Sequence, residues 1–523
     1  MVDILIENGM IIDGSGEPGF IGTIAVENED IVGIFSGKVY IESVKKIDAA
    51  GMWVLPGFID IHRHGDLTPF LKTDEELRQG ITTFINGNCG FSAIPSTEKY
   101  FQMLTDYSKP IIGTIPEEMN GMDQKTLFSR VQNCEMACNQ GYLVGNGTLR
   151  ISVKGFDASP MTRKEMDVLK EKLANSLEAG ALGLSLGLMY VPENFYTFEE
   201  LAEICEIPAK MKKIVTVHMR GEGRSLVQSV QEVIDLAKVC GGKFHISHLK
   251  AAGKRNWHTV IERVIGMVRE ARRSGVDIDF DVYPYCAGST ALYTLLPPKA
   301  LEGGIDKALE RLRDQNFRKK IQCELKEEQE SWDNLVASTG WDRVVLVGGE
   351  KKSEIGKNIQ EIGEQRGLSA EECMMDLLLE NHGDAPIVFY SMCQQDVERI
   401  LWSPESIVIS DALYSEEGLP HPRRYGSFSH LICTYKDQIP IEKIIPKITS
   451  APAKRMGIEN RGSLKTGFKA DIVIISPEKL KDMATYERPR QYPEGIEFVI
   501  VNGKIAKEND GKGASGFFGH LIV

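Results

Sequence analysis

Hydrophobic and polar residues follow one pattern in the middle of the chain and another at its two ends. Between residues 54 and 450, short apolar runs alternate with longer stretches in which apolar residues recur at helical spacing. The short runs are near-continuous, which is typical of parallel strands covered on both faces. They predict eight strands, namely one starting at Val54, then Ile81–Asn86, Tyr142–Val144, Ala181–Ser185, Ile214–Val217, Lys243–Ile246, Val276–Val282 and Ser406–Ile409.

The stretches between these strands carry helix start signals. Thr162 and Glu165 have the spacing of a capping box, in which the N-cap hydroxyl and a carboxylate three residues later bind each other's backbone N–H. Thr197 and Glu200 repeat this pattern before the next helix. Eight strand–helix units in series predict a TIM-type (β/α)₈ barrel, an α/β fold, over residues 55–454.

The two ends of the chain read as short strands separated by turns. Asn8-Gly9 lies between two apolar runs near the start, and Asn502-Gly503 does so near the end. This dipeptide is a strong signal for a hairpin. Because a two- or three-strand sheet at either end would be marginal alone, we predict that residues 1–54 and 455–523 form one small β-sandwich domain.

One connection is too long for a simple barrel. It joins the strands that end at Val282 and begin at Ser406, and it holds the most charged segment, Leu309–Glu330. Long loops of this kind often serve a functional site. We therefore predict an insertion near the barrel mouth, at about residues 286–345.

Composition and charge restrict the function. The chain has 523 residues, of which 42% are hydrophobic and 26% charged, as in ordinary globular proteins. A net charge of −13 argues against nucleic acid or an anionic membrane as a partner. We see no signal peptide and no apolar run long enough to span a bilayer. The ten cysteines lack the spacing of a disulfide scaffold, so we predict reduced thiols and a cytoplasmic location.

Side chains that bind metals follow several of the predicted strands. His62 and His64 lie two positions apart after the first strand, so they share one face. The others are Cys89 after the second strand, His218 after the fifth, His248 after the sixth and Asp411 after the eighth. Because the C-terminal ends of barrel strands converge on one mouth, we expect these side chains to meet. Imidazole and thiolate are the ligands that zinc prefers.

Each residue also has an ordinary structural explanation. A free cysteine is most often a small buried hydrophobe, a single histidine is more often a core residue than a ligand, and Asp411 occupies a position where aspartate often caps the following segment. His245 lies three positions before His248, so we expect it to face outward beneath a helix. Four histidines, a thiol and a carboxylate at strand ends together favour a metal site.

Several motifs carry a resemblance to a known family. They are Leu55–His64, Gly80–Thr83 with Asn86–Gly90, Leu182–Tyr190, His218–Arg220, Ile246–Lys250, Asp281–Tyr285 with Ala287–Ser289, and Ser410-Asp411 to His421–Arg423. In these motifs the chain is similar to the N-acyl-D-amino-acid deacylases (D-aminoacylases) of the amidohydrolase superfamily. Most members of the superfamily bridge two metals with a carboxylated lysine or a glutamate, whereas D-aminoacylases use a cysteine after the second strand. Cys89 is therefore the most diagnostic position.

The resemblance implies a role for each candidate. It assigns a tightly bound zinc to three residues, Cys89, His218 and His248. His62 and His64, with Cys89 and Asp411 nearby, would form a second, weaker metal position. Asp411 would be the general base that takes a proton from the water activated by the metal and later delivers it to the departing amine.

Further positions imply a site for the substrate. Lys250 lies two residues beyond His248 and is expected to face the same pocket. Arg423, Tyr283 and Ser289 match family positions that bind the α-carboxylate of the substrate, and the guanidinium fork of arginine suits a carboxylate. Tyr190 matches a tyrosine at the pocket wall. Without the resemblance, Lys250 and Arg423 would be read as solvated charges and Tyr190 as core packing.

We predict a zinc-dependent amide hydrolase that removes the acyl group from N-acyl-D-amino acids, small molecules with a free carboxylate. A D-amino-acid dipeptidase is a near alternative. A cyclic-amide hydrolase of the hydantoinase or dihydroorotase type would use a carboxylated lysine, and none ends the third or fourth predicted strand. A catalytically inactive scaffold would not need every ligand type. The segment 411–419 differs in detail from the D-aminoacylase form, so the resemblance does not fix which amino-acid side chain of the substrate is preferred. It also allows one or two metals and a homo-oligomer.

Overall fold

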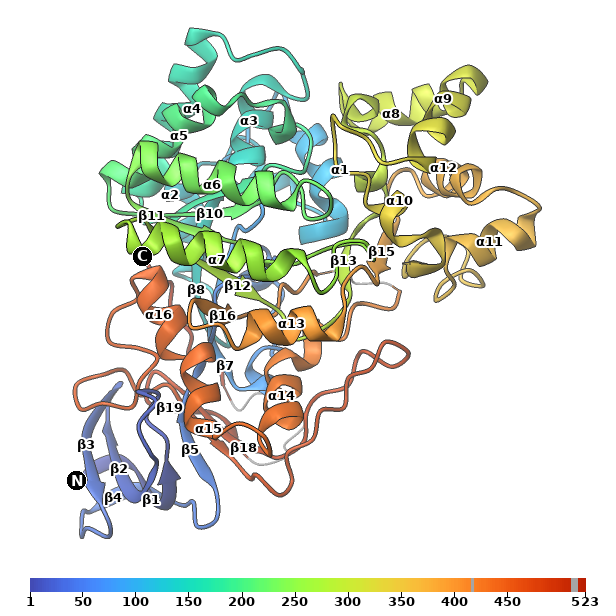
Figure 1. The fold of residues 1–523 in the computed structure, drawn as a ribbon. Helices are drawn as coiled ribbons and strands as arrows, with labels where there is room; N and C mark the ends of the chain where they lie inside the picture. Colours follow the sequence, from blue (N-terminus) through green and yellow to red (C-terminus); the bar gives the residue numbers. More distant parts are fainter. Residues whose placement is uncertain (415–417, 509–515) are drawn as a thin grey trace.

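The computed structural model describes residues 1–414, 418–508 and 516–523 (Figure 1). Its centre is a barrel of eight strands in which every paired neighbour is parallel. In spatial order these strands are β16 (Ser406–Val408), β12 (Asp277–Val282), β11 (Lys243–Ile246), β10 (Ile214–His218), β9 (Gly183–Gly187), β8 (Asn139–Gly145), β7 (Ile81–Asn86) and β6 (Phe58–Asp60). The predicted fold class and eight barrel strands are confirmed. The start of the first strand at Val54 is wrong, because Val54 pairs within the sheet built from the chain ends and the first barrel strand begins at Phe58.

Strands β6 and β16 are joined beyond their own ends. The backbone N–H of Asp411 donates to the carbonyl of His62 over 2.9 Å, and that of His64 donates to the carbonyl of Ala412 over 3.0 Å. The segments that complete the barrel are therefore the same two that carry the predicted metal ligands after the first and last strands.

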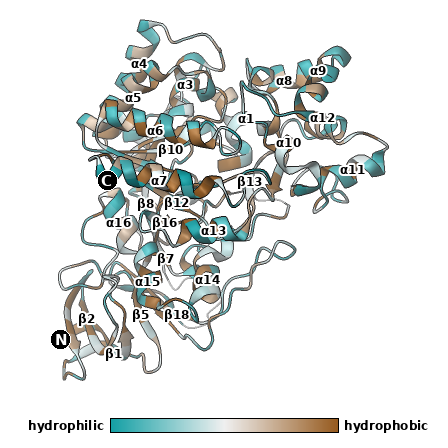
Figure 2. Ribbon diagram, viewed as in Figure 1, coloured by the Kyte–Doolittle hydropathy of each residue, from teal (hydrophilic) through white to brown (hydrophobic). Residues whose placement is uncertain are grey.

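Helices cover the outside of the barrel, and Figure 2 shows brown hydrophobic residues along its strands with mixed brown and teal helices around them. The helices are α1 (Phe101–Ile112), α2 (Gln124–Val131), α3 (Asn146–Lys154), α4 (Arg163–Glu178), α5 (Phe198–Lys210), α6 (Leu226–Cys240), α7 (Val260–Arg273), α13 (Gln394–Leu401), α14 (Arg423–Tyr435), α15 (Ile441–Ile444) and α16 (Ser450–Met456). The capping boxes predicted at Thr162 and Thr197 begin α4 and α5, with both reciprocal hydrogen bonds present. No helix in the described ranges has the length and apolar character needed to cross a membrane.

Both chain ends contribute to one mixed sheet with its own apolar core. Its order is β19 (Lys504–Glu508), β18 (Ile496–Val501), β17 (Ile472–Ile475), β5 (Trp53–Pro56), β1 (Val2–Ile11), β2 (Phe20–Glu27) and β3 (Asp30–Ser36), with β4 (Ser43–Asp48) also paired to β1. The hairpin predicted at Asn502-Gly503 is confirmed, since β18 and β19 pair antiparallel around it.

The hairpin predicted at Asn8-Gly9 is wrong. Strand β1 runs through this dipeptide, and its register with β2 shifts between Ile6 and Gly9. Asn8 has a left-handed backbone with φ of 63°, which bends the strand as in a β-bulge without reversing it. The bend lets the first half of β1 pair with β4 and the second half with β5.

The long connection between β12 and β16 holds a separate antiparallel sheet and a group of helices. The sheet consists of β13 (Gly288–Ala291), β15 (Pro386–Phe389) and β14 (Val344–Leu346), and the helices are α8 (Ile305–Leu312), α9 (Gln315–Lys326), α10 (Leu335–Thr339), α11 (Ile359–Arg366) and α12 (Ala370–Glu380). The insertion extends beyond the predicted bounds of about 286–345. Its central strand is β15 at Pro386–Phe389, which pairs with both β13 and β14. Residues 415–417, which belong to the segment 411–419 that departs from the D-aminoacylase form, lie outside the described residues.

Candidate metal centre

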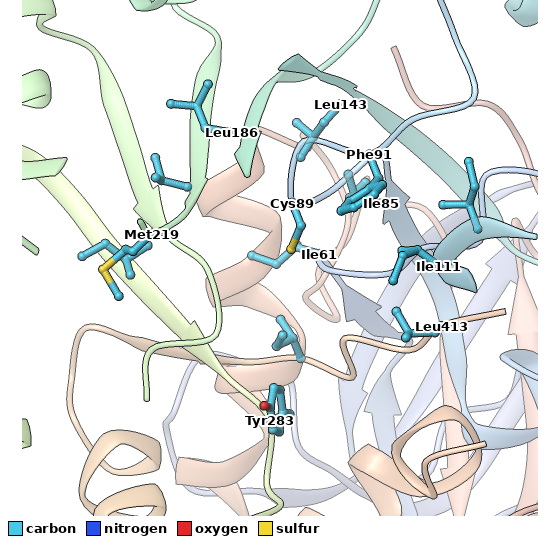
Figure 3. Packing of buried hydrophobic residues seen from close by; sticks show 14 of the residues in the cluster. Ile61, Ile85, Cys89, Phe91, Ile111, Leu143, Leu186, Met219, Tyr283 and Leu413 are labelled. Atoms are coloured by element: carbon cyan, nitrogen blue, oxygen red, sulfur yellow. The ribbon is translucent and has the colours of Figure 1, made fainter. Parts of the chain in front are cut away.

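The six predicted ligands meet at the C-terminal mouth of the barrel. Their donor atoms form two groups, each with all atoms within 4.8 Å of one another, and the groups share one sulfur. The first group is His62, His64, Cys89 and Asp411, and the second is Cys89, His218 and His248. Cys89, which Figure 3 shows among Ile61, Ile85 and Phe91, therefore lies at the centre of the cluster.

Close contacts surround the shared sulfur. Cys89 Sγ lies 3.1 Å from His62 Nε2 and 3.3 Å from His248 Nε2. On the other side, Asp411 Oδ1 lies 3.4 Å from His62 Nε2 and 3.3 Å from His64 Nε2. All six predicted ligands are 6% exposed or less. Such a concentration of polar atoms in a closed site requires partners to offset its desolvation.

Three of the six candidate ligands have left-handed backbone conformations. The φ angles are 53° at Cys89, 35° at His248 and 51° at Asp411. Positive φ is uncommon for residues other than glycine and costs of order 1–3 kcal/mol, so it persists where the surrounding structure imposes it, often at functional sites. These turns direct the side chains into the mouth just after the strands end.

One expectation about orientation is wrong. His245 was expected to face outward beneath a helix, but it is completely buried and its Nε2 lies 3.0 Å from Asp281 Oδ2. Strand β11 ends at Ile246, so His248 lies in the turn that follows it. The alternation of faces along a strand therefore does not relate these two histidines, and both reach the interior.

The residues fit a metal ion of the zinc type. Both ring nitrogens of His218 are buried and have no hydrogen-bond partner among the described residues, as is also the case for His64 Nδ1. Buried polar atoms without partners are rare and commonly mark a missing water or ion. A thiolate with imidazoles and a carboxylate matches the ligand preferences of zinc.

The electrostatic environment favours the metal-binding forms of two side chains. Burial raises the pKa of the Cys89 thiol, but the charges of His62 and His248 outweigh it and hold this pKa well below its usual value. Burial likewise raises the pKa of Asp411, but Arg423 and His62 outweigh it and leave this pKa well below its usual range. Thiolate and carboxylate are the forms that ligate a metal.

The sequence analysis assigned no role to Asp281, the last residue but one of β12, which contacts two imidazoles, that of His62 on the nitrogen away from Cys89. Its Oδ2 lies 3.4 Å from His62 Nδ1 and 3.0 Å from His245 Nε2, and its Oδ1 accepts a hydrogen bond from the backbone N–H of His248. The rule that located the other ligands, a polar residue at a strand end, also applies to Asp281.

Glu222 was missed altogether. Its Oε1 lies 3.1 Å from His248 Nδ1 and 2.5 Å from Lys250 Nζ. A carboxylate on the far nitrogen of a ligating imidazole sets its tautomer and orientation, an arrangement common around bound metals. Glu222 lies in the loop after β10, where no periodicity or strand end marks it, so nothing local in the sequence distinguishes it from a solvated glutamate.

Replacing Glu222 with glutamine should weaken metal binding by about 10- to 100-fold, the usual effect of removing such a supporting carboxylate. The amide keeps the size of the side chain but not the charge facing His248 and Lys250. Competition with a chelator measures the affinity, with Glu203→Gln as the control, since Glu203 pairs with Lys170 at the surface. If both variants bound the metal with the same affinity, Glu222 would not support metal binding at this centre.

Four of the five predicted substrate residues, Tyr190, Lys250, Tyr283 and Ser289, line the cavity beside the candidate ligands. Arg423 does not line it. Its Nη1 lies 2.8 Å from Asp411 Oδ2, and its guanidinium stacks over the Tyr283 ring at 4.6 Å. The remaining walls are largely apolar and include Phe91, Ile111, Met189, Leu295, Leu335, Phe389 and Leu413.

A family profile, sequence relatives and a solved structure all relate this chain to amidohydrolases and deacylases. A profile of the amidohydrolase family matches residues 420–506. The N-acyl-D-glutamate deacylase of Alcaligenes xylosoxydans xylosoxydans is 29% identical, and the D-aminoacylase of the same organism is 28% identical; each match covers 96% of this chain and 93% of the relative. The crystal structure of N-acyl-D-glutamate deacylase from Bordetella bronchiseptica, complexed with zinc and a phosphonate inhibitor, is 26% identical, with a TM-score of 0.82 over 100% of this chain and 99% of that one. The predicted resemblance is confirmed.

Proposed function

We propose that this chain, an amidohydrolase of the D-aminoacylase type, is a metal-dependent enzyme that hydrolyses the amide bond of N-acyl-D-amino acids. The observation that carries the proposal is the position of Cys89, whose sulfur belongs to both groups of candidate ligands. The deacylase relatives described above support the same substrate class for this chain.

We assign the ligands as the resemblance implies. The tightly bound ion, for which the thiolate and imidazoles favour zinc, would be held by Cys89, His218 and His248. A second, weaker ion would be held by His62, His64 and Asp411, with Cys89 shared. A bound metal supplies polarisation of the scissile carbonyl and lowers the pKa of the attacking water.

Asp411 is the proposed general base. Arg423 keeps its carboxylate ionised from one side, while its other oxygen faces His62 and His64. The carboxylate accepts a proton from the attacking water. It then gives that proton to the nitrogen as the C–N bond breaks, so that the products are a carboxylate and a free amine.

The amino-acid carboxylate of the substrate binds beside Tyr283. Lys250 lines the cavity with its Nζ 5.8 Å from the centroid of this ring, and the Arg423 guanidinium lies 4.6 Å from the same ring but outside the cavity wall. Ser289 adds a hydroxyl to the same wall of the cavity. A cyclic-amide substrate is less consistent with this site, because β9 ends at Gly187 and offers no lysine to carry a bridging carboxylate.

Purified protein should release amine from N-acetyl-D-amino acids and not from the L-enantiomers. Amine release should stop after treatment with a chelator and return when zinc is added, because the proposed mechanism needs the metal to polarise the carbonyl and to lower the pKa of the attacking water. The assay is detection of primary amine with matched D- and L-substrates. Release from the L-series, or release unaffected by chelation, would contradict the proposal.

A further inference from the structure

A second cavity adjoins the one beside the candidate ligands. The two share three wall residues, Met189, Tyr190 and Thr294, all of which are partly exposed. Beyond them the second cavity is lined by apolar side chains, including Val191, Tyr293, Leu296, Leu301 and Trp332. Two short helices of the insertion, η5 (Leu292–Leu295) and η6 (Pro298–Leu301), supply part of this wall.

The charged groups at the second cavity are already paired. Arg220 Nη2 lies 2.9 Å from Glu232, and Arg220 Nη1 donates to the carbonyl of Asn194 over 2.8 Å. Asp333 accepts hydrogen bonds from the backbone N–H groups of Gly223 and Arg224. The cavity therefore suits an apolar group better than a carboxylate or an ammonium group.

The proposed chemistry determines which half of the substrate points there. Asp411 must reach the departing nitrogen, so the amino-acid half lies on the side of Asp411 and Arg423. Tyr190 lies on the other side, with its ring 4.5 Å from the His218 ring. The acyl half, bonded to the carbonyl carbon, leaves the cluster toward Tyr190 and the second cavity.

Resting on the proposed function, we propose that the second cavity binds the acyl group, and that this enzyme acts on N-acyl-D-amino acids whose acyl chain is apolar and longer than acetyl. An acetyl group ends within the first cavity. Each further methylene enters the apolar space beyond Tyr190 and is removed from water there.

A chain-length series tests the proposal. The substrates are the acetyl, butyryl and hexanoyl derivatives of one D-amino acid, and kcat/KM is measured for each by amine release. Full burial of one methylene corresponds to about a fourfold gain. Hexanoyl is longer than acetyl by four methylenes, so burial of even two of them should raise kcat/KM for the hexanoyl substrate more than about tenfold above that for the acetyl substrate. The highest kcat/KM with acetyl, or no dependence on length, would overturn the proposal.

Two variants test whether this cavity is responsible. Leu301→Trp fills it, and Trp332→Ala removes a partly exposed wall residue without overpacking the interior. Each should lower the hexanoyl-to-acetyl ratio at least about fivefold. Trp402→Ala is the matched control, since Trp402 packs on Tyr435 outside both cavities, and its ratio should stay as in the wild type. An unchanged ratio in both cavity variants would overturn the assignment.

Failure of the acyl-binding proposal can be distinguished from failure of the proposed function. If amine is released from D-substrates in a metal-dependent manner without regard to acyl length, only the acyl-binding proposal fails. If no D-substrate of any chain length releases amine, the proposed function itself fails.

Discussion

Replacing Cys89 with alanine should remove both the tightly bound metal and turnover. The sulfur is the one donor common to both groups of candidate ligands, so its loss should disrupt both proposed metal positions at once. A metal typically contributes several kcal/mol of transition-state stabilisation, which corresponds to a fall in kcat/KM on the order of 10³-fold or more. Alanine keeps a Cβ at φ of 53°, so the cost of the left-handed backbone is similar in both proteins.

Metal content after dialysis and amine release are the two measurements for this variant. Cys373→Ala is the control, because Cys373 is equally buried but lies on α12 in the insertion. It should keep the metal and the activity, with at most a loss of stability from the small cavity. A Cys89→Ala protein that purifies with its full complement of metal would contradict the assignment of the centre.

Replacing Asp411 with asparagine should lower kcat by about 10²- to 10⁴-fold, the usual contribution of a positioned general base. Asparagine has the same shape and accepts the left-handed conformation well, but it cannot take up the proton of the attacking water. The tightly bound metal should remain, because its three proposed ligands are Cys89, His218 and His248.

Single-turnover rates and metal content separate the possible outcomes for this variant. Asp376→Asn is the matched control, because Asp376 forms an ion pair with Arg318 at 2.6 Å, away from the centre. Full turnover in Asp411→Asn would exclude Asp411 as the base. Loss of the tightly bound metal would contradict its assignment to the other three residues.

Local sequence determined the elements of the barrel and the identity of its donors. Near-continuous apolar runs predict parallel strands because such strands are buried on both faces, and Ile81–Asn86 and Lys243–Ile246 were located to the residue. The capping boxes at Thr162 and Thr197 could be predicted because they depend only on hydrogen bonds between residues three apart in the sequence. The six candidate ligands could be predicted because a closed parallel barrel brings all its strand ends to one rim.

Only the tertiary structure decided which of these groups touch and what supports them. Left-handed turns at Cys89, His248 and Asp411 set the direction of three side chains, and such turns arise from packing rather than from the local pattern. Glu222 and His245 belong to the site through contacts with His248 and Asp281, which lie 26 and 36 residues away along the chain. The backbone at Asn8 also depends on distant neighbours, because pairing of β1 with β4 and then with β5 gives a bend where the local sequence predicts a hairpin. Interactions within a few residues can be read from the sequence, whereas those that depend on neighbours brought close by folding cannot.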